Sequence, residues 1–426
     1  MTITLFLGSL LGSIGLGVPI AFALLVSAVV LMLHLDMFDS QILAQNLVNG
    51  ADSYTLLAIP FFLVAGEVMS RGGLSQRIVT LAMSLVGHKK GGLGFVAIFA
   101  AIIMASLSGS AVADTAALAS MLLPMMRKAG YPLGRSSGLM AAGGIIAPII
   151  PPSIPLIIIG VAGGISISKL FLAGIVPGLI MGATLVVMWL FMTRKEDLVV
   201  AKKATAGERW QALRSSVWAI LLPVIIIGGI KTGIFTPTEA GVVAAVYAIF
   251  VSTLVYRELN LTQLYEVLTI SARSTAIVMF LVAAAMVASW LISIAQLPLM
   301  VADMLAPLAD NPRLLMLAIM GLILVVGMVM DLTPTILVLT PILMPIVKLA
   351  GIDPVYFGIM FVLNCAIGLI TPPVGNVLNV ISSVGNLKFE KAVTGVMPFA
   401  LAYVVILLLF VAFPQIIIWP MNMLSG

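Results

Sequence analysis

The segment that decides the fold is a run of helix breakers inside apolar sequence, Gly143-Gly-Ile-Ile-Ala-Pro-Ile-Ile-Pro-Pro-Ser-Ile-Pro155. A similar run follows later in the chain, Gly368-Leu-Ile-Thr-Pro-Pro-Val-Gly-Asn376. In hydrocarbon every backbone amide and carbonyl must be paired within the protein, so non-helical backbone at membrane depth lines a cavity or is buried in protein. The two runs therefore predict spanning helices near 136–160 and 355–382 that unwind midway.

The composition agrees with a membrane environment. Of the 426 residues 62% are hydrophobic and 9% are charged, which excludes an ordinary soluble globular protein. The net charge of +5 is scattered and forms no basic face for nucleic acid. One cysteine and two histidines exclude an internal disulfide and a Cys/His metal cage. We expect an all-α polytopic membrane protein with around a dozen spans and some half-spans. The N-terminal Met1–Leu7 lacks the basic region of a secretory signal and continues into apolar sequence, so we expect it to belong to a retained span.

Two further apolar blocks carry polar residues near their middle. Ser106-Leu-Ser-Gly-Ser110 interrupts the block 93–126, and Asp331-Leu-Thr-Pro-Thr335 interrupts the block 313–348. Each block is too long for one crossing and predicts a re-entrant helical hairpin with a polar tip. Small residues also serve close helix packing, and proline also merely kinks helices, but four such segments in symmetric pairs favour cavity-lining backbone.

The two halves of the chain resemble each other in four places that lie in the same order. The offset rises from 218 to 221 to 224 residues along the chain, as it would after small loop insertions. The matching pairs are Pro19 with Pro237, Phe62–Ala65 with Phe280–Ala283, Pro124–Gly130 with Pro345–Gly351, and Gly144–Pro148 with Gly368–Pro372. If one half crosses the membrane an odd number of times, the second half is inverted. Inverted repeats of this kind are typical of secondary transporters.

The most hydrophilic segment, Thr193–Ser216, sets the orientation. It contains six Lys or Arg residues against three acids, so the positive-inside rule places it in the cytoplasm. Its second half has Trp210, Leu213 and Val217 at helical spacing beside Arg209 and Arg214. That part is either an amphipathic interfacial helix or a solvated linker.

The four interrupted segments suit the binding of sodium together with an anion. Unwound backbone offers carbonyl oxygens, Ser and Thr offer hydroxyls, and the N-terminal ends of half-helices attract a carboxylate. No Lys or Arg lies within any of the four motifs. Isolated acids within spans are functional candidates. We expect Asp114 and Asp331 to act as coupling or structural residues beside the hairpin tips, and Glu67 and Glu239 to pair with a neighbouring subunit or a buried Lys or Arg.

The four motifs, including Ser106-Leu-Ser-Gly-Ser-Ala-Val-Ala-Asp-Thr115, resemble the large membrane subunit of tripartite ATP-independent periplasmic (TRAP) transporters over essentially the whole chain. Leu35–Asp39 and Leu47–Asp52 resemble the branch that handles sugar acids such as sialic acid or a diketo-gulonate. The resemblance implies a bacterial inner-membrane protein with an elevator-type transport domain and sodium-coupled import. It also implies a periplasmic substrate-binding protein and a small four-helix membrane subunit, expected here as a separate chain.

The resemblance also implies site residues, which we carry over position by position. The sodium ligands would be Ser106, Ser108, Gly144, Ala147 and Pro148 in the first half and Gly327, Gly368, Thr371 and Val374 in the second. Ala147 stands where the second half has Thr371, so only its backbone carbonyl could serve. Substrate would bind between the tips, where the available donors are Ser110, Thr333, Thr335 and Asn376.

Residues 87–195 and 311–426 hold both hairpins and both broken helices, so we expect them to form the moving domain. Residues 1–86 and 196–310 would form the scaffold. Two alternatives remain: a stand-alone sodium/dicarboxylate-type symporter, and a TRAP subunit for C4-dicarboxylates. An enzyme is disfavoured because the chain has no His-Glu-x-x-His motif and no convincing catalytic dyad, and a channel because broken midplane helices suit occlusion.

Overall fold

A computed structural model describes residues 2–194, 196, 202–302 and 311–425, and within these ranges every regular element is a helix. The first half contains α1 (Thr2–Gly15), α2 (Ile20–His34), α3 (Ser40–Ala51), η1 (Tyr54–Leu57), α4 (Ala58–Arg71), α5 (Leu74–Val86), α6 (Gly92–Ser108), α7 (Ala111–Lys128), α8 (Leu133–Gly144), α9 (Ile154–Gly163) and α10 (Ile167–Thr193). The second half contains α11 (Ala206–Lys231), α12 (Pro237–Phe250), η2 (Val251–Val255), α13 (Leu261–Ile294), α15 (Pro312–Gly327), α16 (Leu332–Leu349), α17 (Pro354–Gly368), α18 (Asn376–Gly385), α19 (Phe389–Ala412) and α20 (Gln415–Ser425).

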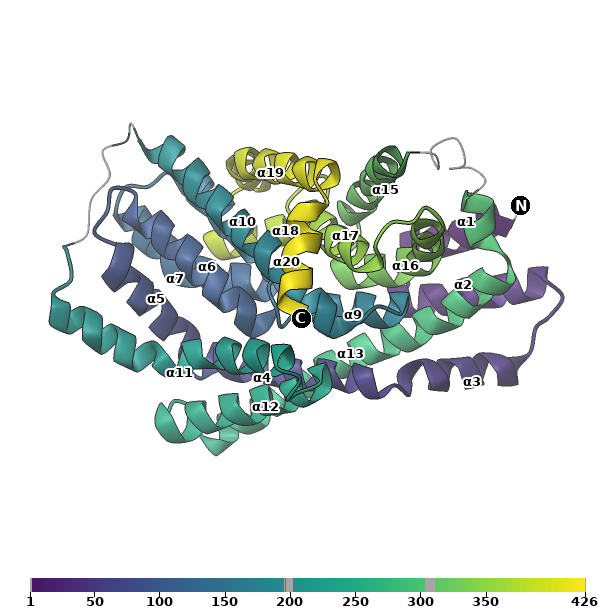
Figure 1. The fold of residues 1–426 in the computed structure, drawn as a ribbon, viewed down its shortest axis with the longest axis horizontal. Coiled ribbons are helices and arrows are strands. Elements are labelled where there is room, and N and C mark those ends of the chain that lie inside the picture. The colour runs from purple at the N-terminus through teal and green to yellow at the C-terminus, as the bar shows by residue number, and fades with distance from the viewer. Residues whose placement is uncertain (1, 195, 197–201, 303–310, 426) are drawn as a thin grey trace.

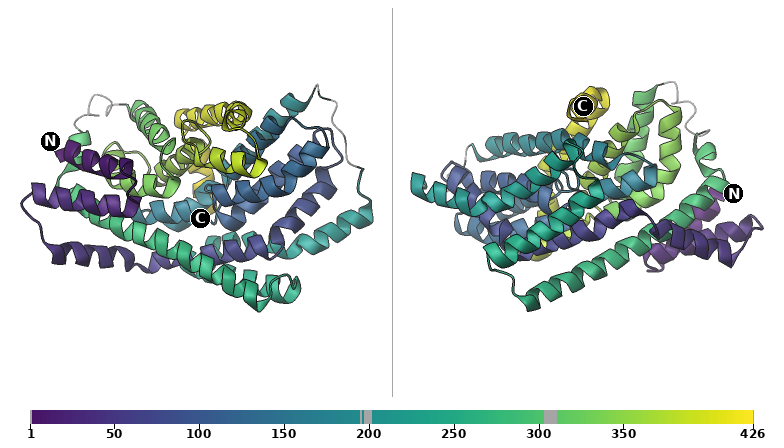
Figure 2. Two further views of the ribbon diagram at one scale, coloured as in Figure 1. Left: turned by 180° about the vertical axis from the view of Figure 1, so that it is seen from behind. Right: turned by 60° about the horizontal axis from the view of Figure 1, so that its bottom comes forward.

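The helices form two layers. In Figure 1 the lower layer contains α3, α4, α11, α12 and α13, where α4 packs against both α12 and α13. The upper layer contains both hairpins, both broken helices and the long helices α10 and α19. The left view of Figure 2 shows the same two layers from behind. The division of the chain into a scaffold and a moving domain stays a prediction.

Both predicted hairpins are present, and they lie in opposite halves of the molecule. Helices α6 and α7 form the first hairpin on the left of Figure 1, and α15 and α16 form the second on the right. Between them, α8 breaks after Gly144 and α17 breaks after Gly368. Each break contains one cis peptide bond, Pro151–Pro152 in the first and Pro372–Pro373 in the second. The repeat read from the sequence is therefore visible in the backbone.

The first apolar block, residues 3–34, forms the two packed helices α1 and α2. Just after α1, Gly17 has φ +82°, a backbone conformation that residues other than glycine rarely adopt. Pro19 then occupies the N-cap position of α2. In the described residues seven helices are long and apolar enough to cross a membrane, and several shorter apolar helices accompany them. Long and short apolar helices thus occur together, as the prediction of spans and half-spans implies.

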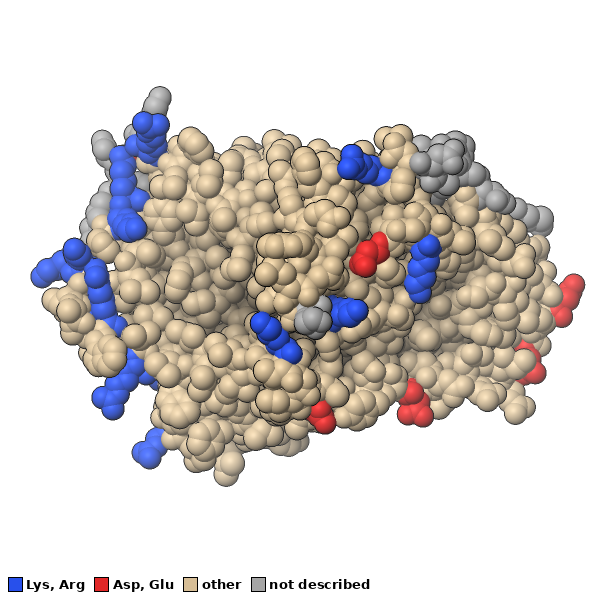
Figure 3. All heavy atoms as spheres, in the orientation of Figure 1, with Lys and Arg blue, Asp and Glu red and all other residues tan. Residues whose placement is uncertain are grey.

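The two ends of the molecule differ in charge. Figure 3 shows Lys and Arg side chains gathered at the left end, where α5, the end of α10 and the start of α11 lie, and Asp and Glu near the right end. Of the two alternatives for the second half of 193–216, the structure has a helix, since α11 begins at Ala206 and Thr205 closes a capping box with Glu208. This helix continues directly into a candidate span, and residues 195 and 197–201 of the segment lie outside the described residues.

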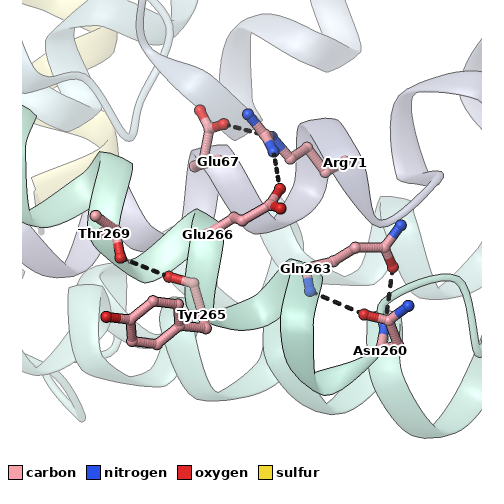
Figure 4. Close-up of polar contacts among 7 residues, drawn as sticks. All are labelled: Glu67, Arg71, Asn260, Gln263, Tyr265, Glu266 and Thr269. Carbon is pink, nitrogen blue, oxygen red and sulfur yellow. Dashed lines mark hydrogen bonds and ion pairs between the residues drawn. The ribbon is translucent and has the colours of Figure 1, made fainter.

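Ion pairs join the scaffold helices near the α4–α5 turn. Arg71 Nε lies 2.8 Å from Glu67 Oε1, and its Nη1 lies 3.4 Å from Glu266 Oε2 on α13, as Figure 4 shows. Arg77 Nη1 lies 2.6 Å from Glu258 Oε1. The expectation for Glu67 is therefore corrected in part: its partner is a half-exposed arginine of the same helix, because residues four apart on a helix are neighbours.

Glu239 also differs from its prediction. Its carboxylate accepts hydrogen bonds from the backbone and hydroxyl of Thr236, each at 2.8 Å, and closes a capping box at the start of α12. Neither a cation nor a second subunit is needed to account for this acid, since the helix N-terminus supplies unpaired amides and a favourable dipole.

Candidate functional site

The tip of the first hairpin is tight and closed by polar side chains. Gly109 has φ +62° and reverses the chain between α6 and α7. Ser110 caps α7, because its hydroxyl accepts a hydrogen bond from the backbone N–H of Ala113 at 3.3 Å. The backbone N–H of Ser110 in turn donates to the hydroxyl of Ser108 at 3.2 Å. These bonds hold the tip in one shape without any charged group at the turn itself.

Asp114 lies one helical turn below this tip and is 3% exposed. One carboxylate oxygen, Oδ1, accepts a hydrogen bond from the hydroxyl of Ser108 across the hairpin. The other oxygen, Oδ2, is buried and has no hydrogen-bond partner among the described residues. Asp114 thus ties the two arms together, and its Oδ2 is a buried oxygen without a partner among the described residues. A buried, unpaired carboxylate oxygen is costly, so it points to a missing ligand.

The first hairpin packs against the first broken helix at two points without room for larger residues. A Cβ on Gly109 would lie 3.0 Å from the carbonyl oxygen of Pro152. A Cβ on Gly144, at the end of α8, would lie 1.9 Å from the hydroxyl oxygen of Thr115. Thr115 is fully buried, and its hydroxyl has no partner among the described residues. Asp114 and Thr115 therefore bring two unsatisfied oxygens to the first hairpin, with Thr115 at its contact with the broken helix.

The second half repeats this packing with backbone in place of side chains. A Cβ on Gly368, at the end of α17, would lie 2.6 Å from the carbonyl carbon of Gly327, at the end of α15. At the tip, the backbone N–H of Gly375 donates to the carbonyl of Met328 at 3.2 Å. The predicted ligand residues Gly327 and Gly368 are therefore in direct contact, and the tip of the second hairpin is tied to the unwound segment.

The predicted hydroxyl ligands are engaged with nearby carbonyls. Thr371 donates to the carbonyl of Ile367 at 2.8 Å, and Ser106 donates to the carbonyl of Ile103 at 2.6 Å. A hydroxyl oxygen that donates its proton still has lone pairs for a cation. The carbonyl of Pro148 accepts the hydroxyl of Ser153 at 2.5 Å, and that of Val374 accepts the side-chain amide of Asn379 at 3.3 Å. Ala147 is fully buried in the first break.

A cavity of about 210 Å³ lies between the first tip and the scaffold. Its lining includes Ser108, Ser110 and Asp114 from the hairpin, and Glu67 from α4 and Ser274 from α13. The packing around it is tight, since a Cβ on Gly66 would lie 3.3 Å from the Cα of Ser108. The cavity therefore opens where the moving domain would contact the scaffold.

The predicted substrate residues do not all line this cavity. Ser110 does, whereas Thr333, Thr335 and Asn376 are not part of its lining. Thr335 is buried and donates to the carbonyl of Asp331 at 2.7 Å. Asp331 is exposed at the second tip, where it occupies the N-cap position of α16 without a side-chain cap bond. The first tip thus faces a cavity beside the scaffold, whereas the predicted substrate residues of the second tip do not line that cavity.

The sequence analysis did not select Thr115 and gave Asp114 only a coupling or structural role. Asp114 and Thr115 follow the tip by about one helical turn. Because residues four apart lie on one face of a helix, this spacing could have predicted that they lie close to the tip. The approach of Thr115 to Gly144 joins residues 29 positions apart, and periodicity within one helix does not predict it.

Comparison with known proteins gives consistent results over the whole chain. The family model described as tripartite ATP-independent periplasmic transporter, DctM component, matches residues 7–416. The 2,3-diketo-L-gulonate TRAP transporter large permease protein YiaN of Escherichia coli K12 is 62% identical over 425 residues, and the match covers 100% of each chain. The sialic acid TRAP transporter large permease protein SiaM of Vibrio cholerae is 40% identical over 411 residues, with 96% of each chain covered.

A relative that carries a different substrate name is also similar. The C4-dicarboxylate TRAP transporter large permease protein DctM of Pseudomonas aeruginosa is 38% identical over 374 residues, with 88% of each chain covered. Among solved structures, the YdaH transporter of Alcanivorax borkumensis aligns with a TM-score of 0.66 at 15% identity, and the match covers 88% of each chain. At that identity the likeness concerns the fold alone.

Proposed function

This chain belongs to the DctM component family of tripartite ATP-independent periplasmic transporters, and from that premise we propose that it imports an organic acid by coupling its entry to sodium. It is a multi-pass membrane transport protein and not an enzyme. The observation that carries the coupling proposal is the buried Asp114 Oδ2, which has no partner beside the first hairpin tip. A carboxylate held in that way needs a cation or a proton for compensation.

The first sodium ion would bind where the first hairpin meets the first broken helix. Asp114 supplies the anionic oxygen, and Thr115 and Ser108 supply hydroxyl oxygens. Carbonyls of Gly144, Ala147 and Pro148 complete the proposed set, with Ser106 one turn away on α6. Hard cations prefer such oxygen donors, and a single carboxylate balances the charge of one sodium ion. Asp114 thereby fills the ligand position that Ala147 leaves without a side chain.

The second sodium ion would bind where Gly327 contacts Gly368. Here the proposed ligands are carbonyls of Gly327, Gly368 and Val374 together with the hydroxyl and carbonyl of Thr371. None of these side chains carries a charge, so the two proposed sites differ in electrostatics although their backbones match. A neutral site releases its ion more readily, because less electrostatic energy is lost when the ion leaves.

The proposed substrate is a sugar acid of the diketo-gulonate kind, which binds between the tips and near the ions. The most similar of the relatives described above carries that substrate in its name, at 62% identity over the full chain. Helix N-termini at both tips, the hydroxyls of Ser110, Thr333 and Thr335, and the amide of Asn376 are suited to a polyhydroxylated carboxylate. C4-dicarboxylates form the competing substrate class.

Movement of residues 87–195 and 311–426 against the rest would carry the site across the membrane. The cavity between the first tip and α4 gives a direct test, because Ser110 and Ser70 both line it. A Ser70→Cys, Ser110→Cys pair should be joined by a short dithiol crosslinker in one orientation only. The native Cys365 is fully buried and should not compete. Equal crosslinking with and without sodium and substrate would contradict an elevator movement.

The proposed complex contains a separate small membrane subunit and a periplasmic substrate-binding protein in the bacterial inner membrane. The decisive experiment is uptake into proteoliposomes that contain both membrane subunits. Radiolabelled diketo-gulonate, sialic acid and succinate are compared, with and without the binding protein and an inward sodium gradient. Uptake should need both additions and should be largest for one sugar acid. Robust sodium-driven uptake of free substrate would favour a stand-alone symporter, and uptake without sodium would contradict the coupling.

A further inference from the structure

A groove of about 400 Å³ lies on the outer side of the first hairpin, between α6 and α10. Its walls are apolar and come from Phe95, Phe99 and Ile102 on α6 and Val186 and Leu190 on α10. At one end the groove is closed by Lys89 and Lys90 of the α5–α6 turn, and no acidic residue lines it among the residues that the structure describes. It therefore combines a long hydrocarbon surface with two cations at a single end.

The two lysines have unused hydrogen-bonding capacity. The ammonium of Lys90 donates to the carbonyl of Arg194 at 3.1 Å, which leaves two of its three protons available. The side chain of Lys89 is exposed and makes no hydrogen bond or ion pair within the part of the chain that the structure describes. Two ammonium groups that lack acidic partners at a membrane surface attract a phosphate.

The surroundings of these lysines are also positive. Partial burial, together with the positive charges of Arg209, Lys203 and Lys89, lowers the pKa of His88 in the same turn. The end of the molecule where α5, α10 and α11 meet carries most of the Lys and Arg visible in Figure 3. This is the end that the positive-inside rule assigns to the cytoplasm.

The groove is fixed by close contacts between its two helices. The indole N–H of Trp189 donates to the carbonyl of Gly91 at 2.8 Å, and the indole ring occupies the place where a Cβ on Gly94 would lie. Farther along, Gly182 of α10 lets Ile102 approach, since a Cβ there would lie 2.5 Å from Ile102 Cδ1. The two long walls of the groove belong to α6 and α10, and Val86 at the end of α5 adds to the lining near the lysines.

We propose that this groove binds an anionic phospholipid of the cytoplasmic leaflet, with its phosphate between Lys89 and Lys90 and one acyl chain along α6 and α10. The apolar walls alone would accept any lipid. The paired lysines without an acid favour a head group with net negative charge over a zwitterionic one. Because both walls belong to the proposed moving domain, the lipid would stay bound in both orientations.

The test measures lipids bound to the full chain by native mass spectrometry, after titration with phosphatidylglycerol or phosphatidylcholine. Phosphatidylglycerol should bind more tightly, and a K89Q/K90Q variant should bind it roughly 10- to 30-fold more weakly, as expected for loss of two lysines at a membrane surface. The matched control is K388Q/K391Q, which removes two exposed lysines that do not line this groove and should leave binding unchanged.

A second pair of variants tests the acyl-chain part without changing charge. Val186→Trp should fill the groove and lower binding of phosphatidylglycerol, whereas Val187→Trp, at an exposed position that does not line the groove, should not. Glycerol phosphate, which has no acyl chain, should fail to displace the lipid. The proposal would be overturned by equal affinity for the two lipids or by displacement of the lipid by glycerol phosphate. It would also be overturned if either control variant weakened binding as much as its matched test variant.

Discussion

The two hairpin tips have the same backbone plan but different chemistry. At the first tip, Ser108 and Asp114 join the arms, and Asp114 keeps one buried oxygen unpaired. At the second tip, a backbone bond from Gly375 to Met328 replaces the side-chain bond, and Asp331 is exposed. In the repeat register Asp114 corresponds to Thr335, which hydrogen-bonds to its own helix. The repeat has thus kept the close helix contacts while placing its buried carboxylate on one side only.

This difference bears on how an ion would be held at each tip. A buried carboxylate binds a cation strongly, and its burial costs free energy once the cation leaves. Neutral carbonyls and a hydroxyl bind a cation more weakly, and less free energy is lost when it leaves. The first proposed site would therefore dominate the sodium affinity, and the second would set how readily an ion is released. The predictions below test this asymmetry, beginning with the largest expected effect.

The largest effect is expected from Asp114→Asn. The amide has the same shape and can still bond to Ser108, so the hairpin should fold, but the anionic oxygen is lost. Sodium affinity in transport assays should fall by roughly 100-fold or more, the range for losing a strong charged contact. Asp36→Asn, an exposed acid without a partner in the described residues, is the control for charge alone and should behave like the wild type. Unchanged sodium dependence in Asp114→Asn would remove this carboxylate from the site.

A smaller effect is expected from Thr371→Ala at the second site. The substitution removes one hydroxyl oxygen and little volume, and the carbonyl of residue 371 remains. Loss of one oxygen ligand that no other group replaces costs about 1–3 kcal/mol of binding free energy, which corresponds to roughly 5- to 100-fold in sodium affinity. Thr371→Ser should restore the affinity because it restores the hydroxyl. If Thr371→Ala lowered the affinity more than Asp114→Asn does, the proposed order of the two sites would be reversed.

Alanine substitutions at the contact glycines of the two halves, Gly144 and Gly368, should lower the stability of the protein by different amounts. Gly368→Ala places a methyl group 2.6 Å from backbone of Gly327, which cannot move aside easily, so about 1–3 kcal/mol of stability should be lost. In Gly144→Ala the closest atom is the side-chain oxygen of Thr115 at 1.9 Å, which can rotate, and the Cβ and backbone nitrogen of Thr115 follow at 2.9 Å. Only one of these three atoms is backbone, whereas all three nearest atoms at Gly368 are, so the loss should be smaller. Gly321→Ala has no atom within 4 Å and serves as control. Thermal unfolding of the purified chain in detergent ranks the three variants, and equal losses at 144 and 368 would contradict the distinction.

Much of this architecture could be predicted from the sequence because clustered helix breakers unwind the backbone, and unwound backbone at membrane depth must be buried in protein or line a cavity. The Ser-Leu-Ser-Gly-Ser tip and the Gly-Pro runs gave the hairpins and broken helices within a few residues. The role of Glu239 was readable, since Thr236-Pro-Thr-Glu239 has the spacing of a capping box, but its isolation in apolar sequence suggested an ion pair instead.

The site itself was predicted less completely, for a physical reason. Local spacing identifies which backbone unwinds, and Gly144 and Gly368 were chosen in that way. Whether an oxygen is satisfied depends on contacts between distant segments, such as Thr115 with Gly144 or Met328 with Gly375. The asymmetry between the tips depends on such contacts, and the halves otherwise look alike in sequence.

The smallest expected effect separates the tips by helix capping. Ser110 caps α7 through the N–H of Ala113, whereas Asp331 stands at the same position of α16 and makes no cap bond. Loss of an N-cap bond costs about 0.5–2 kcal/mol, and the cap distance of 3.3 Å indicates the lower end of that range. Ser110→Ala should therefore lower the unfolding temperature slightly more than Asp331→Ala does, in detergent without substrate and sodium. If Asp331→Ala were the more destabilising variant, its carboxylate would stabilise α16 in solution, and the two tips would be alike in capping after all.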